Sequence, residues 1–270
     1  MVDDTCHTSQ PVLPPELEQE IVETAALMMI SFPLMPMNCA LELQLTGRRF
    51  REWTMPFLYR LLHTDKFFVG RTESECIEIL SKYGRRTTHV YLGLDTSKAI
   101  TILEHCPNVQ DIVNWHEEIK LSDIHPSIQK SSNLRRLSAF LEELPTNLLL
   151  SPAYSSITHL DVMDWMDWDL LVNFPNLSHL CFTDSYEIPH VYDVIDRLTH
   201  KDHGCKSLRV IICLYLLWGQ SADARFIKLL LPDTHVEHEA EWMKYSNGGM
   251  DFWEFAERMV FARKGNWVSE

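Results

Sequence analysis

A short apolar pattern recurs along the middle of the chain at nearly regular intervals. Its clearest copy is FPNLSHLCF (174–182), in which Leu177, Leu180 and Phe182 follow the order apolar-x-x-apolar-x-apolar. Copies start at residues 87, 109, 134, 157, 177 and 208, so the intervals are 22, 25, 23, 20 and 31 residues. This constrains the fold strongly, because each repeat is a small unit that buries its apolar side only by stacking on its neighbours.

The spacing also predicts the structure of one unit. A strand, a turn and a helix together use about 20–29 residues, which is the interval of leucine-rich repeats. Pro107-Asn108 and Pro175-Asn176 end the intervening helices before the next strand. We therefore expect an α/β fold, an irregular leucine-rich-repeat-like solenoid with a parallel sheet. The alternative is a set of coincidental strands in an ordinary α/β sheet.

Three regions of the chain differ in their residue patterns. We expect residues 1–70 to form a helical head or N-terminal cap, and residues 71–230 to form the solenoid. Residues 231–270 are expected to be a helical C-terminal capping segment, continuous with the solenoid as one domain. A terminal cap is needed because the last repeat otherwise exposes its core.

Helix signals lie on both sides of the repeats. After Pro14-Pro15, the residues Leu17, Ile21, Ala25 and Met28 are spaced like one side of a helix. Further helices are expected over residues 40–46 and 50–62. Capping-box patterns at residues 72–75 and 251–254 open helices that end near residues 83 and 263. The expected apolar stripe of the last helix is Phe252, Phe255, Met259 and Val260.

The head sequence resembles an F-box. Leu13-Pro14-Pro15-Glu16-Leu17 and Ile21 match the start of that motif, and its later positions follow in order as Leu43, Leu45, Arg48-Arg49, Trp53, Pro56 and Tyr59. The whole chain is similar to fungal, F-box-like leucine-rich-repeat proteins. The resemblance implies that the head binds a Skp-type adaptor through Leu13, Pro14 and Leu17. It further implies a substrate-receptor subunit of a cullin-type ubiquitin ligase. The alternative is a head that only caps the first repeat.

Composition excludes several other classes of function. The net charge is −14, and no Lys/Arg run exceeds two residues, which argues against nucleic-acid binding. The longest apolar stretch, residues 25–41, is broken by Pro33 and Pro36, so no membrane span is expected. Seven scattered cysteines without a CxxC pair, and no signal-peptide pattern, predict the cytoplasm or nucleus.

Strand alternation places a polar row on the outward face of the predicted sheet. The first row is His89, Asp111, Arg136, His159, His179 and Val210. The second is Tyr91, Val113, Ser138, Asp161, Cys181 and Ile212. The third is Gly93, Trp115, Phe140, Met163, Thr183 and Leu214. His159 and His179 are therefore expected side by side, with Asp161 one step along the strand.

Three interpretations of this face remain. The first is a surface that binds a protein partner, formed by Trp115, Arg136, Phe140, His159 and His179. The second is an enzyme acting on a small molecule, with candidate acid–base residues His159, His179 and Asp161, and with Asp223, Arg225 and Asp251 arriving from the tail. The third is a face covered by an insertion or the C-terminal segment, where the histidines are ordinary satisfied polar groups.

We expect no cofactor and no metal site. Side chains on a flat sheet diverge, which opposes a closed shell of metal ligands. The acidic stretch DWMDWD (164–169) lacks the glycine and terminal glutamate of a calcium loop. It is interpreted as a turn in which Asp164 or Asp167 caps the next helix.

Overall fold

The computed structural model describes residues 13–31, 47–141, 144–164, 167–183, 191–214, 221, 223–229, 242, 245–246 and 250–265, with the backbone alone for residues 27–31. The chain divides into two compact units, Met1–Leu58 and Tyr59–Glu270. The expected helix over residues 40–46 and the F-box positions Leu43 and Leu45 lie outside the described residues, as does the side chain of Met28.

The first unit contains helices α1 (Pro15–Ser31) and α3 (Arg48–Leu58), which pack against each other. Val22 and Ala26 of α1 are buried. An ion pair between Glu18 and Arg49 also joins the two helices. Leu17 and Ile21 of the expected apolar face are exposed instead.

The second unit contains one eight-stranded sheet in which every neighbouring pair is parallel and the strand order follows the chain. Its strands are β1 (Leu61–His63), β2 (His89–Leu92), β3 (Asp111–Asn114), β4 (Arg136–Ala139), β5 (His159–Val162), β6 (His179–Phe182), β7 (Val210–Leu214) and β8 (Phe226–Leu229). The six strands expected from the repeated pattern are confirmed as β2 to β7. The pattern did not identify β1 or β8.

The start of the sheet departs from the expected helix over residues 50–62. That helix ends at Leu58, and residues 61–63 form β1. The reason is pairing: Leu61 and Leu62 lie beside His89 and Val90 of β2, and the Arg60 carbonyl accepts the amide of His89. The sheet thus satisfies backbone groups that a helix terminus leaves unpaired. The unit boundary after Leu58 places β1 with the sheet, within residues 1–70 of the expected head.

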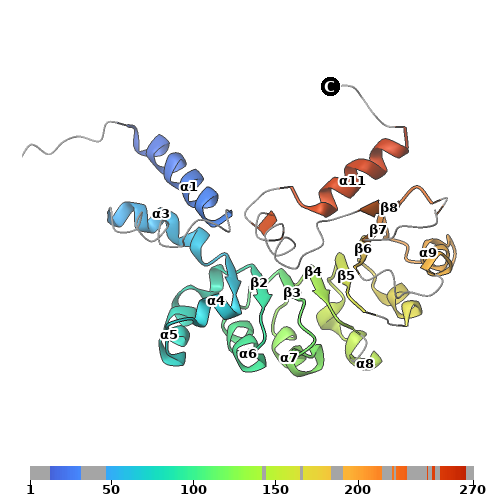
Figure 1. Ribbon diagram of the computed structural model, residues 1–270, viewed down its shortest axis with the longest axis horizontal. Helices are drawn as coiled ribbons and strands as arrows, with labels where there is room; N and C mark the ends of the chain where they lie inside the picture. Colours follow the sequence, from blue (N-terminus) through green and yellow to red (C-terminus); the bar gives the residue numbers. More distant parts are fainter. Residues whose placement is uncertain are drawn as a thin grey trace, which may run out of the picture. The chain divides into compact units, whose positions relative to one another are not determined.

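Helices connect consecutive strands and lie on one side of the sheet, whereas α11 (Phe252–Arg263) lies on the other (Figure 1). The connecting helices are α4 (Thr64–Phe68), α5 (Glu73–Tyr83), α6 (Thr96–His105), α7 (Leu121–Ile128), α8 (Thr146–Leu149) and α9 (Val191–Thr199), with short 3-10 turns η1 (Gly84–Arg86), η2 (Pro152–Tyr154) and η3 (Trp168–Asn173). No helix in the described ranges is long and apolar enough to cross a membrane.

Two local predictions about helix starts are confirmed. Thr72 and Glu75 form a reciprocal capping box at the start of α5. Asp167 accepts a hydrogen bond from the Asp169 amide and caps η3. Within the residues that the structure describes, no group of three or more His, Cys, Asp or Glu side chains is arranged to hold a metal ion.

The sheet has a core on each side. Leu137, Leu160 and Leu180 occupy equivalent positions toward the connecting helices and are at most 2% exposed, as expected. On the opposite side, Val210 and Ile212 pack with residues of α11.

The expected stripe of α11 is wrong in part, because Phe255 is 47% exposed, and the buried residues are Trp253, Ala256 and Val260. Glu257, four residues after Trp253, lies on the same side of the helix and contacts His179.

Candidate functional site

The polar row at the starts of the strands lies beneath α11 and two residues of the preceding segment. The register joins His89, Asp111, Arg136, His159, His179 and Val210 in the expected order. His89, Asp111 and His179 are buried. Trp242 and Tyr245 lie against His89, and Trp253 lies against both His159 and His179. Residues of the C-terminal segment therefore cover this row, as one of the three interpretations expected.

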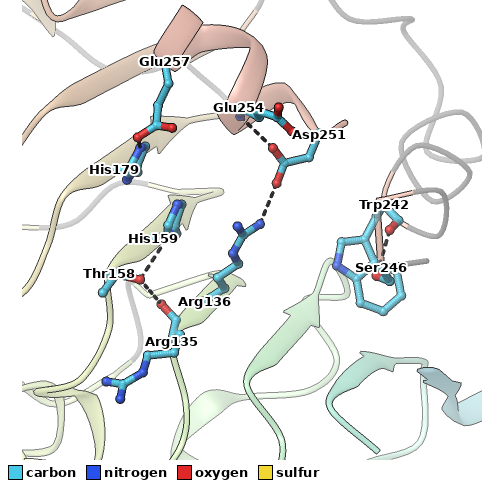
Figure 2. Close-up of polar contacts among 10 residues, drawn as sticks. All are labelled: Arg135, Arg136, Thr158, His159, His179, Trp242, Ser246, Asp251, Glu254 and Glu257. Carbon is cyan, nitrogen blue, oxygen red and sulfur yellow. Dashed lines mark hydrogen bonds and ion pairs between the residues drawn. The ribbon is translucent and has the colours of Figure 1, made fainter. Parts of the chain in front are cut away.

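His159 and His179 form the predicted pair on adjacent strands. Their rings stack nearly parallel, with centroids 4.0 Å apart. Each Nδ1 contacts the hydroxyl of the residue before it, at 2.9 Å for Thr158 and 2.8 Å for Ser178. Those hydroxyl oxygens also lie 3.1 Å from the carbonyl oxygens of Arg135 and Thr158, respectively. Figure 2 shows Thr158 between His159 and Arg135.

We assign the ring proton of neutral His159 to Nδ1. A hydroxyl has one hydrogen, and Thr158 is placed to donate it to the Arg135 carbonyl, so that Thr158 accepts a hydrogen bond from Nδ1–H of His159. The Nε2 of neutral His159 is then a hydrogen-bond acceptor. Thr88 and His89 repeat the same pairing on β2. The Ser/Thr-His dipeptide at one position of three strands is a sequence signal for buried neutral histidines that the sequence reasoning missed.

His179 differs from the other two histidines. Its Nε2 lies 2.9 Å from Glu257 Oε1 of α11 (Figure 2). Neutral His179 with its proton on Nε2 donates this hydrogen bond to the carboxylate, and its Nδ1 then accepts a hydrogen bond from the Ser178 hydroxyl. The His179–Glu257 hydrogen bond links the sheet to α11.

Burial holds the histidines of this row in the neutral form. It lowers the pKa of His89 to about 3 and that of His159 to about 2, and the positive charge of Arg136 contributes to both shifts. Burial also lowers the pKa of His179, although Glu257 opposes this shift. At neutral pH, His159 is consequently a hydrogen-bond acceptor with a low tendency to take up a proton.

An ion pair fixes the start of α11 to the sheet. Arg136 Nη1 lies 2.6 Å from Asp251 Oδ2, and Oδ1 of the same carboxylate accepts the Glu254 amide at 2.7 Å. Figure 2 shows Arg136 reaching from β4 to Asp251. The guanidinium group also lies 4.3 Å from the ring centroid of Tyr245. Asp251 therefore caps its helix and anchors it at the same time.

Asp161 belongs to a separate hydrogen-bond chain. It accepts hydrogen bonds from Ser138 Oγ at 2.6 Å and from the Thr183 hydroxyl, and Trp115 Nε1 donates to Ser138 Oγ at 2.6 Å. Nδ1 of His159 is used by Thr158, so these bonds do not form the His–Asp pair expected for acid–base catalysis.

The two remaining catalytic candidates lie apart from this row. Asp223 and Arg225 pair with each other at 2.7 Å, and Arg225 also donates to the carbonyls of Thr199 and Leu208. Asp251 is the candidate from the tail that reaches the polar row. The expected six-residue catalytic set is therefore only partly brought together.

A cavity of about 70 Å³ lies between this face of the sheet and α11. It is lined by Asp111, Val113, Trp115, Arg136, Leu137, Ser138, His159, Asp161, Met163, Thr183, Leu214, Trp242, Tyr245, Asp251, Phe252 and Trp253. Sequence reasoning missed Trp242 and Tyr245, which lie in a polar stretch without periodicity. Phe140, expected on the same surface, is half-buried and is not one of these lining residues.

Comparison with known proteins does not assign the chain to a family. No protein-family model matches it, and no curated protein matches it significantly.

Proposed function

We propose that the protein is an interaction module of the F-box-like, leucine-rich-repeat type. The observation that carries the proposal is an exposed apolar row at the start of the head. Leu13, Leu17 and Ile21 are 42%, 48% and 56% exposed. Leu17 and Ile21 are four apart in α1 and share one side of the helix, distinct from the side of the buried Val22 and Ala26, and Leu13 lies just before the helix begins. A second apolar side on a packed helix suits a protein partner.

The proposed partner of this row is a Skp-type adaptor of a cullin-type ubiquitin ligase. The match of residues 13–17 to Leu-Pro-x-Glu-Leu supports it, because Leu13, Pro14 and Leu17 are all exposed. The protein would then act in the cytoplasm or nucleus, as a substrate receptor.

The second unit is proposed to be an irregular leucine-rich-repeat-like solenoid that recognises the substrate. Its support is the strand order, which follows the chain, together with repeat intervals of 20–31 residues. In this proposal, the partner contacts Trp115, Arg136 and Phe140. Each of these side chains is only half-buried, so part of it remains open to a partner. His159 and His179 contribute by holding α11.

Co-elution of the full chain with a purified Skp-type adaptor at micromolar concentration tests the head. Wild-type protein is expected to co-elute, and the Leu13→Asp/Leu17→Asp double variant is expected to lose binding without a change in its thermal unfolding midpoint. Leu150→Asp is the matched control, because Leu150 is 46% exposed but lies in the second unit. Absence of co-elution with the folded wild type would overturn the adaptor proposal.

A small-molecule role is the second candidate, and the cavity is the observation that favours it. It combines aromatic walls with a few polar groups, as ligand sites do. Ligand binding is favoured over turnover, because a general base works best with a pKa near the operating pH, whereas that of His159 is about 2. Direct binding measurements test this candidate independently of the adaptor.

A further inference from the structure

We propose that the cavity between the sheet and α11 binds a small organic ammonium cation, an amine in its protonated form. The inference rests on the second candidate function, that the cavity is a ligand site, and it is independent of the adaptor proposal. Four properties of the lining support it: charge, an uncompensated carboxyl group, the supply of hydrogen-bond acceptors, and aromatic rings.

The charged lining residues favour a cation. Three carboxyl groups, Asp111, Asp161 and Asp251, line the cavity, and the only Lys or Arg among the described lining residues is Arg136. Arg136 is already paired with Asp251 at 2.6 Å. An anionic ligand would have to compete for this one guanidinium group while facing two further carboxyl groups. A cation is instead attracted by these two carboxyl groups, and the one positive charge near it is already paired with Asp251.

Among the three carboxyl groups, Asp111 has the fewest partners that would stabilise a negative charge. It is 4% exposed, and it makes no ion pair with any residue in the described ranges. Burial raises its pKa to about 7, although Arg136 and the Trp242 side chain oppose the shift. A buried carboxyl group that lacks a counter-ion gains stability when a cation enters beside it.

The carboxyl groups of the cavity and Nε2 of His159 are acceptors, whereas Trp242 Nε1 is a buried donor that makes no hydrogen bond within the described residues. Nε2 of His159 has a lone pair and accepts no hydrogen bond from the described residues, whereas Nδ1–H is directed to Thr158. The donors of Trp115, Ser138 and Thr183 are used within the chain that ends at Asp161. A ligand forms hydrogen bonds with the carboxyl groups and His159 Nε2 by supplying donors, which an ammonium group does.

Aromatic rings complete the site. Trp115, Trp242, Phe252 and Trp253 line the cavity, and their faces attract cations. Tyr245 is less available because Arg136 lies over its ring. The cavity volume of about 70 Å³ is several times the roughly 10–15 Å³ that one water needs, so a small amine is a reasonable occupant.

Three probes of nearly equal shape test the charge requirement: benzylammonium, benzyl alcohol and benzoate. Binding to the full chain is measured by isothermal titration calorimetry. We expect benzylammonium to bind at least tenfold more tightly than the other two. Asp111→Asn should weaken benzylammonium at least tenfold and leave benzyl alcohol unchanged. Asp123→Asn is the control for general attraction, because the chain carries a net charge of −14 and Asp123 is exposed on α7.

A pH series tests the same group without a substitution. The carboxylate form of Asp111 binds the cation, so affinity should rise from pH 6 to pH 8 and fall by up to tenfold per unit below the pKa of about 7. The charged and titratable groups around Asp111 are Arg60, His89, Arg136, Tyr245 and Asp251. His89, with a pKa of about 3, and Tyr245, whose pKa burial raises, do not titrate in this range.

Each outcome decides between the proposals. Tighter binding of benzoate would overturn the ligand class and keep the cavity as a site. No binding of any probe would overturn both the inference and the small-molecule candidate, and would leave the adaptor proposal untouched. Unchanged benzylammonium affinity in Asp111→Asn would remove Asp111 from the site. If that variant does not fold, a flat pH series for the wild type is the contradicting result.

Discussion

The two faces of the sheet are both covered, but by different kinds of contact. Toward the connecting helices, each strand presents aliphatic residues such as Leu137, Leu160 and Leu180. Toward α11, the same strands begin with a polar row that includes His89 and Asp111. The first face is held by the removal of apolar surface from water. The second is covered at the cost of desolvating polar groups, so each group needs a partner.

The buried polar groups of this face obtain their partners in two ways. Each histidine takes a hydroxyl partner from the residue before it, as Thr158 does for His159. Arg136 instead takes a carboxylate from a distant segment, Asp251. The apolar side of α11 holds it to the sheet, because Trp253 and Val260 of this side pack on the last strands. The polar contacts add little net energy but specify where the helix begins.

The largest difference between the faces should appear on removing Leu160. Leu160→Ala deletes fully buried side-chain atoms and leaves a cavity, so the free energy of unfolding should fall by about 2–5 kcal/mol. Urea unfolding followed by circular dichroism measures it. Leu150→Ala, at a residue that is 46% exposed, should cost less than about 1 kcal/mol. A loss below about 0.5 kcal/mol for Leu160→Ala would contradict its place in the core.

The polar face should give a smaller loss. Arg136→Ala leaves the Asp251 carboxylate, whose side chain is 6% exposed, without its counter-charge. We expect a loss of about 2–3 kcal/mol, because the remaining buried charge must be desolvated alone. Arg258→Ala is the matched control. It breaks an exposed ion pair with Glu254 and should cost about 0.5 kcal/mol or less. Equal losses in the two variants would mean that the Arg136 pair is solvated.

The smallest effect, per unit of pH, concerns His89. Its pKa is about 3 in the folded protein and 6.5 ordinarily, so between these values the unfolded chain binds one more proton. Stability from this group is therefore complete above pH 6.5 and falls by about 1.4 kcal/mol per unit as the pH decreases. In an Asp111→Asn background, His89→Phe should remove that slope from a series of unfolding curves. An unchanged pH dependence would show that His89 is charged or hydrated in the folded state.

Asp111 has the opposite sign. Its folded pKa of about 7 lies above its ordinary 3.8, so the folded protein binds the extra proton between these values. Stability from the protonated group is then lost as the pH rises toward 7. His89 and Asp111 offset each other in the wild type, and the slope of each is visible only when the other is replaced.

Local patterns predicted most of the sheet, and long-range contacts account for what was missed. Alternation along each strand was enough to align His159 with His179, because neighbouring parallel strands repeat one pattern in register. β1 was missed because three residues are too few to show a period. Trp242 and Tyr245 were missed because their positions depend on contacts with residues more than 100 positions earlier, such as the contact of Tyr245 with Arg136.

The strand order has a consequence for synthesis of the chain. Each strand pairs with the strand made just before it, so the sheet can grow as the polypeptide leaves the ribosome. Glu257 follows His179 by 78 residues, which is a delay of roughly 4–16 s at about 5–20 residues per second. During that delay the aliphatic face is already closed by its own helices, while the row from His89 to His179 is still hydrated. A nascent chain paused before α11 would therefore expose a hydrated polar row at the strand starts, beside apolar side chains that include Val113 and those of β7 and β8.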